Sequence, residues 1–174
     1  MPEHRSDITI RPLHAGEHEA VDAVFAGLSP RSRYLRFHTP LPRLTAPWRH
    51  LLLDIDGVRH VAIIAEHRAE HGIEPVGIAR LVRTGPVSAE LAFSVVDAWH
   101  RSGIGRSLLS VLLTRAADLG YERVTALALI ENRGAVALLQ SVLPDGVLRR
   151  SGATYEFSSP VPRPARRDRA LVAV

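Results

Sequence analysis

The sequence contains no cysteine, and none of its 22 basic residues is a lysine, so all of them are arginines. Without cysteine the chain cannot form a disulfide, a thiolate metal site or a cysteine nucleophile. Without lysine it cannot form a phosphate-binding P-loop, which requires a Gly-Lys pair. Aromatic residues make up only 5% of the chain, and the net charge of +4 does not form a basic stripe with interleaved aromatics. A nucleic-acid-binding protein is therefore not expected.

Long apolar runs are also missing. No segment approaches the roughly 20 apolar residues that a membrane-spanning helix needs, so no membrane partner is expected. The first residues, "MPEHRSD", are polar and do not resemble a signal peptide, which favours a cytoplasmic protein. The 174 residues, of which 46% are hydrophobic, suffice for one domain with a sizeable core.

Apolar periodicity predicts one α/β domain over residues 7–158, followed by a Pro/Arg-rich tail over 159–174. The central strands are expected to form an antiparallel meander, and 88–96, 103–119 and 123–130 a parallel crossover unit. The predicted strands are 7–13, 60–67, 74–83, 88–96, 123–130 and one or two strands within 147–158. The predicted helices are 15–28, 29–38, 44–53, 103–119 and 132–143.

Two helices have predicted inward faces. Helix 44–53 is expected to bury Trp48, Leu51 and Leu52. Helix 103–119 is expected to bury one stripe, consisting of Ile104, Leu108, Val111, Leu112 and Leu119. In the helix that begins after Ser29, this serine is the expected N-cap.

A glycine pair separates strand 88–96 from the helix that follows, in "AFSVVDAWHRSGIGRSLLSVLL". Glycine at 103 and 105 allows an anion to approach the backbone, and the free amides of a helix N-terminus attract it. Arg101 and Arg106 can add charge-assisted contacts, which favours a pyrophosphate ligand. A Rossmann fingerprint fits poorly, because Leu108 stands where a third small residue is needed. A tight turn that binds nothing is the other interpretation.

Two segments, "HAGEH" (14–18) and "HRAEH" (67–71), match the zinc-peptidase pattern H-x-x-E-H. Two histidines four residues apart bind one metal only on a continuous helix. Neither segment is predicted to lie within one, so no metal is expected.

The segment "VVDAWHRSGIGRSLL" resembles the acetyl-CoA pyrophosphate loop of the GNAT N-acetyltransferase superfamily, with His100 where that family has Gln or Arg. "IENRGAVALL" is similar to the start of the family's fourth helix, and "LSPRSRYLRFH" and "AELAFSVVDAWHRSGIG" resemble its bacterial protein-lysine acetyltransferase branch. The resemblance implies a mixed, mostly antiparallel sheet of six to seven strands flanked by about four helices. It also implies a bulge near Val95 that splays the sheet. The cofactor-binding residues that we expect for acetyl-CoA are Phe93, Val95, His100, Arg101, Ser102, Gly103, Ile104, Gly105, Arg106 and Asn132.

Glu90 is the expected catalytic base. In "SAELAFSVV" it shares a strand face with Ala92 and Ser94, which leaves a hollow for substrate, and partial burial would increase its basicity. The resembled branch has a glutamate at this place as its general base. The alternative is a glutamate paired with Arg80 or Arg83 of the neighbouring strand.

The resemblance implies acetyl transfer from acetyl-CoA to a primary amine, by direct attack because no cysteine is present. A protein lysine is the first expectation for the acceptor. The alternatives are a small-molecule amine, a protein N-terminus, or a non-catalytic CoA-binding regulatory module. No oligomeric state is predicted.

One detail of the site departs from the family pattern. Leu139 stands where many family members have a tyrosine that protonates the leaving thiolate, which leaves Tyr34 and Ser94 as substitutes.

The helix 29–38 is expected to contribute to the acceptor site. We expect its residues Arg33, Tyr34 and Phe37 to contact the acceptor. Core packing of the aromatics with a solvated basic face is the alternative.

Overall fold

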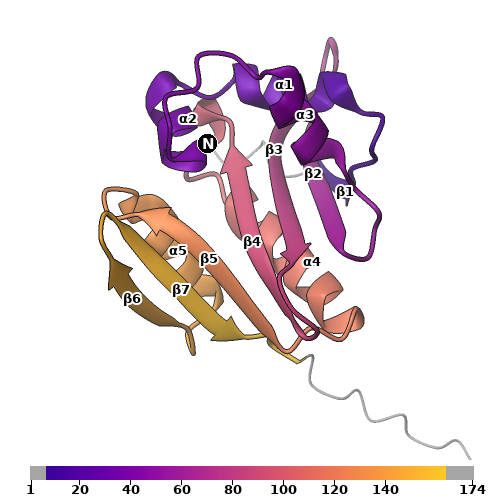
Figure 1. Cartoon of the computed structure of the whole chain (residues 1–174). Helices are drawn as coiled ribbons and strands as arrows, with labels where there is room; N and C mark the ends of the chain where they lie inside the picture. Colours follow the sequence, from indigo (N-terminus) through magenta and orange to yellow (C-terminus); the bar gives the residue numbers. More distant parts are fainter. Residues whose placement is uncertain (1–6, 164–174) are drawn as a thin grey trace, which may run out of the picture.

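The computed structural model describes residues 7–163, which form a seven-stranded sheet with the strand order β1-β2-β3-β4-β5-β7-β6 (Figure 1). The strands are β1 (Ile8–Pro12), β2 (His60–Ala69), β3 (Gly72–Arg83), β4 (Ser88–Val95), β5 (Arg123–Leu129), β6 (Val147–Ser151) and β7 (Thr154–Pro160). The helices are α1 (His18–Ala26), α2 (Pro30–Phe37), α3 (Ala46–Leu53), α4 (Ile104–Asp118) and α5 (Arg133–Val142), and a 3-10 helix, η2 (Asp97–Trp99), precedes α4.

Every neighbouring pair of strands is antiparallel except β4 and β5, which α4 connects as a parallel crossover. The α/β class, the antiparallel meander and the crossover unit are thereby confirmed. One connection differs from the expectation. The predicted strands 60–67 and 74–83 leave residues 68–73 as a loop, but the turn between β2 and β3 contains only Glu70 and His71, and Gly72 already pairs with Ala69.

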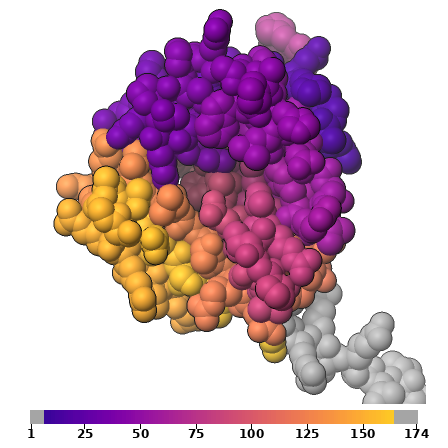
Figure 2. Space-filling model, in the orientation of Figure 1, coloured from indigo at the N-terminus to yellow at the C-terminus, as the bar shows by residue number. Residues whose placement is uncertain are grey.

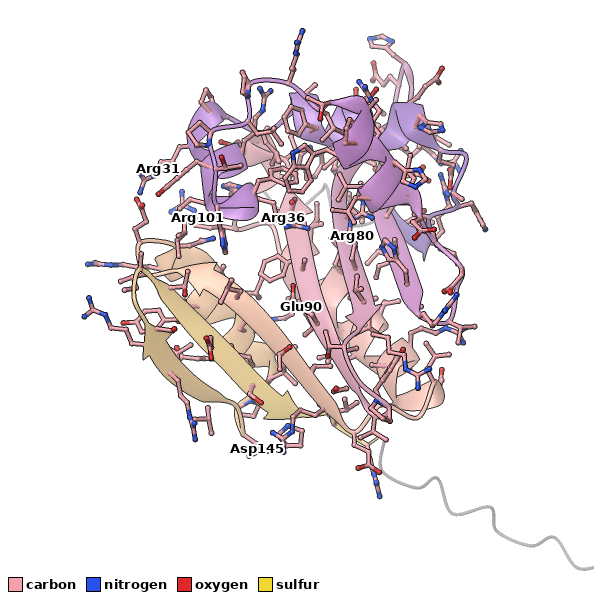
Figure 3. All side chains as sticks on the ribbon, viewed as in Figure 1. Arg31, Arg36, Arg80, Glu90, Arg101 and Asp145 are labelled. Atoms are coloured by element: carbon pink, nitrogen blue, oxygen red, sulfur yellow. The ribbon has the colours of Figure 1, made fainter. Side chains whose placement is uncertain are left out.

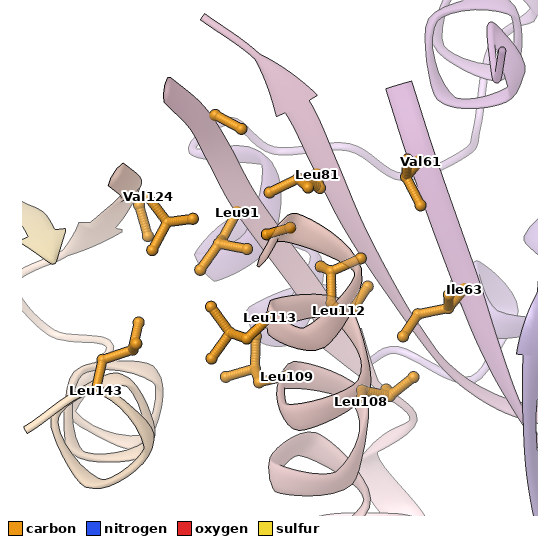
Figure 4. Close-up of a cluster of buried hydrophobic side chains, with 14 of the residues drawn as sticks. Val61, Ile63, Leu81, Leu91, Leu108, Leu109, Leu112, Leu113, Val124 and Leu143 are labelled. Carbon is orange, nitrogen blue, oxygen red and sulfur yellow. The ribbon is translucent and has the colours of Figure 1, made fainter. Parts of the chain in front are cut away.

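The two faces of the sheet are covered differently. Helices α4 and α5 lie against one face, whereas α1, α2 and α3 gather at one end of the other face (Figure 1). Leucines of α4, including Leu108 and Leu112, pack on Ile63 and Leu81 in the larger core cluster (Figure 4). A second cluster joins α1 and α3 to the opposite face of β2 and β3. Half of that second face is therefore left open.

Local capping confirms two helix starts. Ser29 is the N-cap of α2, because its Oγ accepts a hydrogen bond from the Ser32 amide at 3.2 Å. Asn132 caps α5 in the same way, with its Oδ1 accepting from the Ala135 amide at 3.2 Å. Both caps satisfy helix amides that would otherwise have no partner.

Two predicted core positions are wrong. Leu51 is 60% exposed and Val111 is 43% exposed. In α3 the buried leucines are Leu52 and Leu53, because the helix presents its last turn to the core. The buried stripe of α4 is shifted sideways to include Leu109 and other residues, because α4 packs against α5 as well as against the sheet.

Element ends also differ from the prediction. Helix α1 begins at His18 rather than residue 15, since a turn precedes it. Strand β7 continues past residue 158, and both Ser159 and Val161 are buried. The first residues of the expected tail thus belong to the sheet, and its residues 164–174 lie outside the described part of the chain.

A stability prediction follows from Gly146, which directly precedes β6. A Cβ atom at this position would lie 2.0 Å from Cζ of Phe157, a side chain that is only 1% exposed. Gly146→Ala is therefore expected to lower the free energy of unfolding by about 1–3 kcal/mol, measured by urea denaturation. Gly134→Ala is the matched control, because nothing lies within 4 Å of its Cβ position and alanine favours the helix. Equal stability of the two variants would contradict the packing described here.

Candidate functional site

The site lies where β4 and β5 separate. These two strands pair at only three positions, the last of which is Glu90 with Thr125. β4 remains paired with β3 as far as Val95 and β5 with β7 as far as Leu129, so the sheet separates only between β4 and β5. A cavity of about 640 Å³ lies beyond the point of separation (Figure 2). We refer to this cavity as the fork cavity.

The expected bulge near Val95 is not the cause of this opening. The pairing of β4 with β3 has no register shift between Ser88 and Val95, and the irregularity in this part of the sheet lies at Ala65 and Glu66 of β2. The strands separate because β5 turns away after the third paired position. The sheet is splayed here as predicted, but the cause is the end of pairing between β4 and β5 and not a bulge.

Backbone groups of β4 face the fork cavity. The Val96 amide donates to the Val76 carbonyl of the neighbouring β3 at 2.9 Å. Because the amides of alternate residues in a strand point in opposite directions, those of Phe93 and Val95 face away from β3 and towards the fork. The carbonyl of Val95 contacts Nε2 of His100 at 2.9 Å.

The N-terminus of α4 lies at the same cavity. Gly103, the N-cap, has a φ of 92°, and Arg101 also has a positive φ, of 61°. The first intrahelical bond runs from the Ser107 amide to the Gly103 carbonyl at 3.0 Å, so the amides of residues 104–106 have no partner inside the helix. With the positive end of the helix dipole, these amides can bind an anion.

Positive charge dominates the lining of the fork cavity. Five arginines line it, namely Arg31, Arg36, Arg101, Arg106 and Arg133. Among the described residues, Glu131 is the one carboxylate in the lining, and it pairs with Arg31 at 3.2 Å across the mouth. The cavity therefore suits a ligand with several negative charges.

The predicted cofactor-binding residues mostly meet at this cavity. The lining includes Phe93, Val95, His100, Arg101, Gly103, Gly105, Arg106 and Asn132. Ser102 and Ile104 are not in the lining. The Ser102 hydroxyl donates to the Trp99 carbonyl at 2.6 Å, and Ile104 is a core residue with 4% exposure. The sequence pattern could not distinguish Ser102 and Ile104 from the residues that line the cavity, because they lie in the same short loop.

Gly105 has a packing role besides any contact with a ligand. A Cβ atom there would lie 2.8 Å from Cδ2 of Leu138 in α5. The absence of a side chain thus allows α4 and α5 to approach each other beside the cavity.

Glu90 lies on the open sheet face at the last paired position before the fork, and Figure 3 shows it on β4. The expected partial burial is not found, since its side chain is exposed where α2 and α3 do not reach. No hydrogen bond or ion pair with another described residue engages its carboxylate. Neither alternative partner is used, because Arg80 donates to the Leu52 carbonyl and Arg83 to the Gly85 carbonyl.

The three residues predicted to contact the acceptor do not line the fork cavity. Phe37 packs edge-on against Trp48 with 5.2 Å between ring centroids, and its ring lines a smaller cavity. The Arg33 guanidinium stacks over the Phe25 ring at 4.3 Å and donates to backbone carbonyls. Tyr34 lines neither cavity. The packing interpretation of this helix therefore holds for Phe37 and Arg33, whose side chains the short α2 directs towards α1 and α3.

Two arginines lie together beside the site, and their proximity was not predicted, although Arg36 was considered for contact with an acidic substrate surface and Arg80 as a partner of Glu90. Arg36 lies on α2 and Arg80 on β3, and both point to the end of β4 beneath the N-terminal helices (Figure 3). Burial lowers the pKa of Arg36 to about 10, an effect that the charge of Glu90 opposes. Burial and the charge of Arg36 lower the pKa of Arg80 to about 9. Helical and strand periodicity gave no signal for this pair, since their proximity depends on how α2 lies over β3.

The H-x-x-E-H segments do not form metal sites. His14 precedes α1 and His18 begins it, so the two histidines do not share a helix. His67 lies in β2 and packs on Trp99 at 4.7 Å between ring centroids. Over residues 7–163, no group of three or more His, Asp or Glu side chains is placed to hold a metal ion.

The same residues contain no candidate membrane span. Their helices are too short or too polar to cross a membrane.

Comparison with known proteins gives a family match. The sequence model of the Acetyltransferase (GNAT) family matches residues 26–143. Among solved structures, the GNAT domain of S. lividans PAT is similar with a TM-score of 0.77 and 25% identity, over 87% of this chain and 89% of that one.

Two further structures share the fold. A phosphinothricin acetyltransferase from Sinorhizobium meliloti, in complex with AcCoA, has a TM-score of 0.70 and 17% identity, over 92% of this chain and 94% of that one. The cAMP-binding acyltransferase from Mycobacterium smegmatis has a TM-score of 0.62 and 24% identity, over 90% of this chain. The present chain spans only 44% of that longer protein.

The conformation of the loop before α4 can be tested by substitution. Gly103→Ala is expected to lower the free energy of unfolding by about 1–2 kcal/mol, because alanine disfavours the left-handed region in which Gly103 lies. Gly103→Asn is expected to cost less, since asparagine tolerates that region better. Urea denaturation measures both. If Gly103→Ala were as stable as the unsubstituted protein, the loop would not have the conformation described.

Proposed function

The chain belongs to the GNAT acetyltransferase family, and we propose that it transfers an acetyl group from acetyl-CoA to a primary amine, with a protein lysine as the first candidate acceptor. The observation that carries this proposal is the arginine-lined fork cavity, which contains the free N-terminal amides of α4. A volume of about 640 Å³ lies within the range of small-molecule binding sites.

The donor set at the fork fits a nucleotide diphosphate. The amides of residues 104–106 would hold its oxygens, and Arg101 and Arg106 would add charge. His100 contacts the Val95 carbonyl, so in this proposal its side chain positions the loop and leaves the phosphate to the amides. When bound, acetyl-CoA supplies an activated thioester carbonyl at which an amine can attack.

Glu90 accepts the proton of the incoming ammonium in this proposal. An alkyl ammonium has a pKa of about 10.4, so it needs a base to remove its proton before the amine can act as a nucleophile. Over residues 7–163 the carboxylate of Glu90 has no hydrogen-bond or ion-pair partner, and Glu90 lies outside the lining of the fork cavity, at the last paired position before the strands separate. The amides of Phe93 and Val95 face the fork and can donate to the oxygen that becomes negative during attack.

The leaving thiolate requires a proton or a donor. Leu139, at the place where many family members have a tyrosine, lines the cavity with a buried side chain and cannot supply one. Of the two hydroxyls considered as substitutes, Ser94 lines the fork cavity and Tyr34 does not. Ser94 is thus the better candidate for this contact.

The acceptor proposal is supported by two likenesses. The GNAT domain of S. lividans PAT resembles this chain over most of both lengths, and the segments "LSPRSRYLRFH" and "AELAFSVVDAWHRSGIG" resemble the protein-lysine acetyltransferase branch. A small-molecule amine or a protein N-terminus would use the same chemistry. A regulatory module that binds coenzyme A without turnover would use only the fork cavity.

Binding and turnover distinguish these possibilities. Calorimetry with acetyl-CoA is expected to show binding, and free-thiol release is expected with a lysine-bearing protein more than with a panel of small amines. Absence of heat with acetyl-CoA would overturn the proposal. Binding of acetyl-CoA without release of the CoA thiol in the presence of any acceptor would identify the non-catalytic module. Thiol release with small amines alone would show that the acceptor is a small-molecule amine and not a protein lysine.

The role of Glu90 is tested by Glu90→Gln, which keeps the size of the side chain and removes the base. Turnover is expected to fall roughly 100-fold or more, while the affinity for acetyl-CoA remains nearly unchanged. Glu156→Gln is the matched control. Glu156 pairs with Leu127 of β5, so it is another exposed carboxylate on the open face of the same sheet. Full activity of Glu90→Gln would show that another group is the base.

A further inference from the structure

A second, smaller cavity lies beside the fork cavity. It has a volume of about 30 Å³ and lies between the N-terminal helices and the sheet. Its polar lining residues are Arg36, Arg80 and Ser94, and the remaining lining residues are apolar. Leu28, Arg36 and Ser94 line both cavities, so the two cavities are direct neighbours.

The two arginines are not paired with a carboxylate. Arg80 is only 5% exposed, donates to the Leu52 carbonyl and lies 3.4 Å from Nε2 of His60. Among the described residues, no Asp or Glu lies within ion-pair distance of Arg36 or Arg80. A buried guanidinium normally has an anionic partner, because removal of the charge from water is otherwise costly.

Other charged groups near the pair do not balance it. Glu90 acts on Arg36 and on His38 through its charge, but its carboxylate is exposed. Asp54 and Asp56 act on His60 and not on Arg80. Burial lowers the pKa of both histidines, which keeps them neutral near pH 7. The cluster thus holds two cations against one carboxylate.

We propose that Arg36 and Arg80 bind a carboxylate carried by the acceptor, so that the preferred acceptors are amines with a nearby carboxylate. The guanidinium groups offer the geometry that binds a carboxylate. The inference rests on the proposed function, since it places the acceptor amine at Glu90.

The arrangement along β4 fits such a molecule. Glu90, Ala92 and Ser94 share one face, and the four residue steps from Glu90 to Ser94 span about 13 Å of strand. Arg36 extends over this face from α2, and its charge interacts with Glu90 (Figure 3). An amine at Glu90 and a carboxylate at the arginines therefore lie on one continuous surface. The carboxylate can belong to a free amino acid or to an acidic residue next to a target lysine.

The test compares acceptors that differ only in the carboxylate. One pair is L-lysine and cadaverine, and the other is a lysine peptide with a flanking glutamate and the same peptide with glutamine. For the unsubstituted protein, kcat/KM is expected to be at least about 10-fold higher for the carboxylate-bearing member of one pair or both. The pair that shows the preference identifies the source of the carboxylate.

Variants then assign the preference to the arginines. Arg80→Gln is expected to reduce the ratio within a pair to near one, through KM for the carboxylate-bearing acceptor and with unchanged KM for acetyl-CoA, because Arg80 lines only the smaller cavity. Arg36→Gln is expected to reduce the ratio as well, and only the ratio is compared for this variant, because Arg36 also lines the fork cavity. Arg80→Lys, whose ammonium is favoured again once a carboxylate binds beside it, is expected to restore part of the preference. Arg83→Gln is the matched control, because Arg83 lies on the same strand, on the opposite face and exposed. It is expected to leave the ratio unchanged.

Two results would overturn the inference. The first is a ratio near one in both pairs for the unsubstituted protein, which requires no variant to fold and leaves the proposed acetyl transfer intact. The second is a preference that survives both glutamine variants, with folding verified by thermal denaturation. If no acceptor is acetylated, the proposed function fails. Calorimetry of the CoA-saturated protein with the same pairs then decides the inference, and equal or absent binding contradicts it.

Discussion

The separation of β4 from β5 is the constraint on which the rest of the site depends. In β4, the backbone amides and carbonyls of alternate residues pair with β3. Because pairing with β5 ends at Glu90, the amides and carbonyls of the residues in between face a cavity. The connection from β4 to α4 starts at the same end of the sheet, so the free amides of a helix N-terminus reach that cavity too. One change in strand direction thus brings two kinds of backbone donor together.

Electrostatics then determines what this cavity can hold. Its side chains are strongly cationic, and all of the cations are arginines because the chain contains no lysine. Arginine keeps its charge when partly desolvated and binds phosphate or carboxylate oxygens through two parallel donors. The same property allows Arg36 and Arg80 to remain charged beneath the N-terminal helices, where an ammonium would lose its proton more readily.

Prediction from sequence succeeded where the property is local. The cap at Ser29, the helix start after Gly103 and the face that carries Glu90 each depend on a few adjacent residues. It failed where a neighbouring element decides the outcome. Leu51 was expected to face the core and is exposed, because α3 presents its last turn to the core. Val111 was expected in the buried stripe of α4 and is exposed, because α4 packs against α5 as well as against the sheet.

The order of helices and strands, the glycine loop and the absence of lysine from the cavity were thus determined by the sequence alone, because composition, periodicity and backbone preference need no distant contact. The depth of the fork, the exposure of Glu90 and the meeting of Arg36 with Arg80 were decided only by the tertiary structure. These features depend on how far α2 and α3 extend over the sheet and on where β5 diverges, and contacts between segments so distant in the chain leave no local pattern.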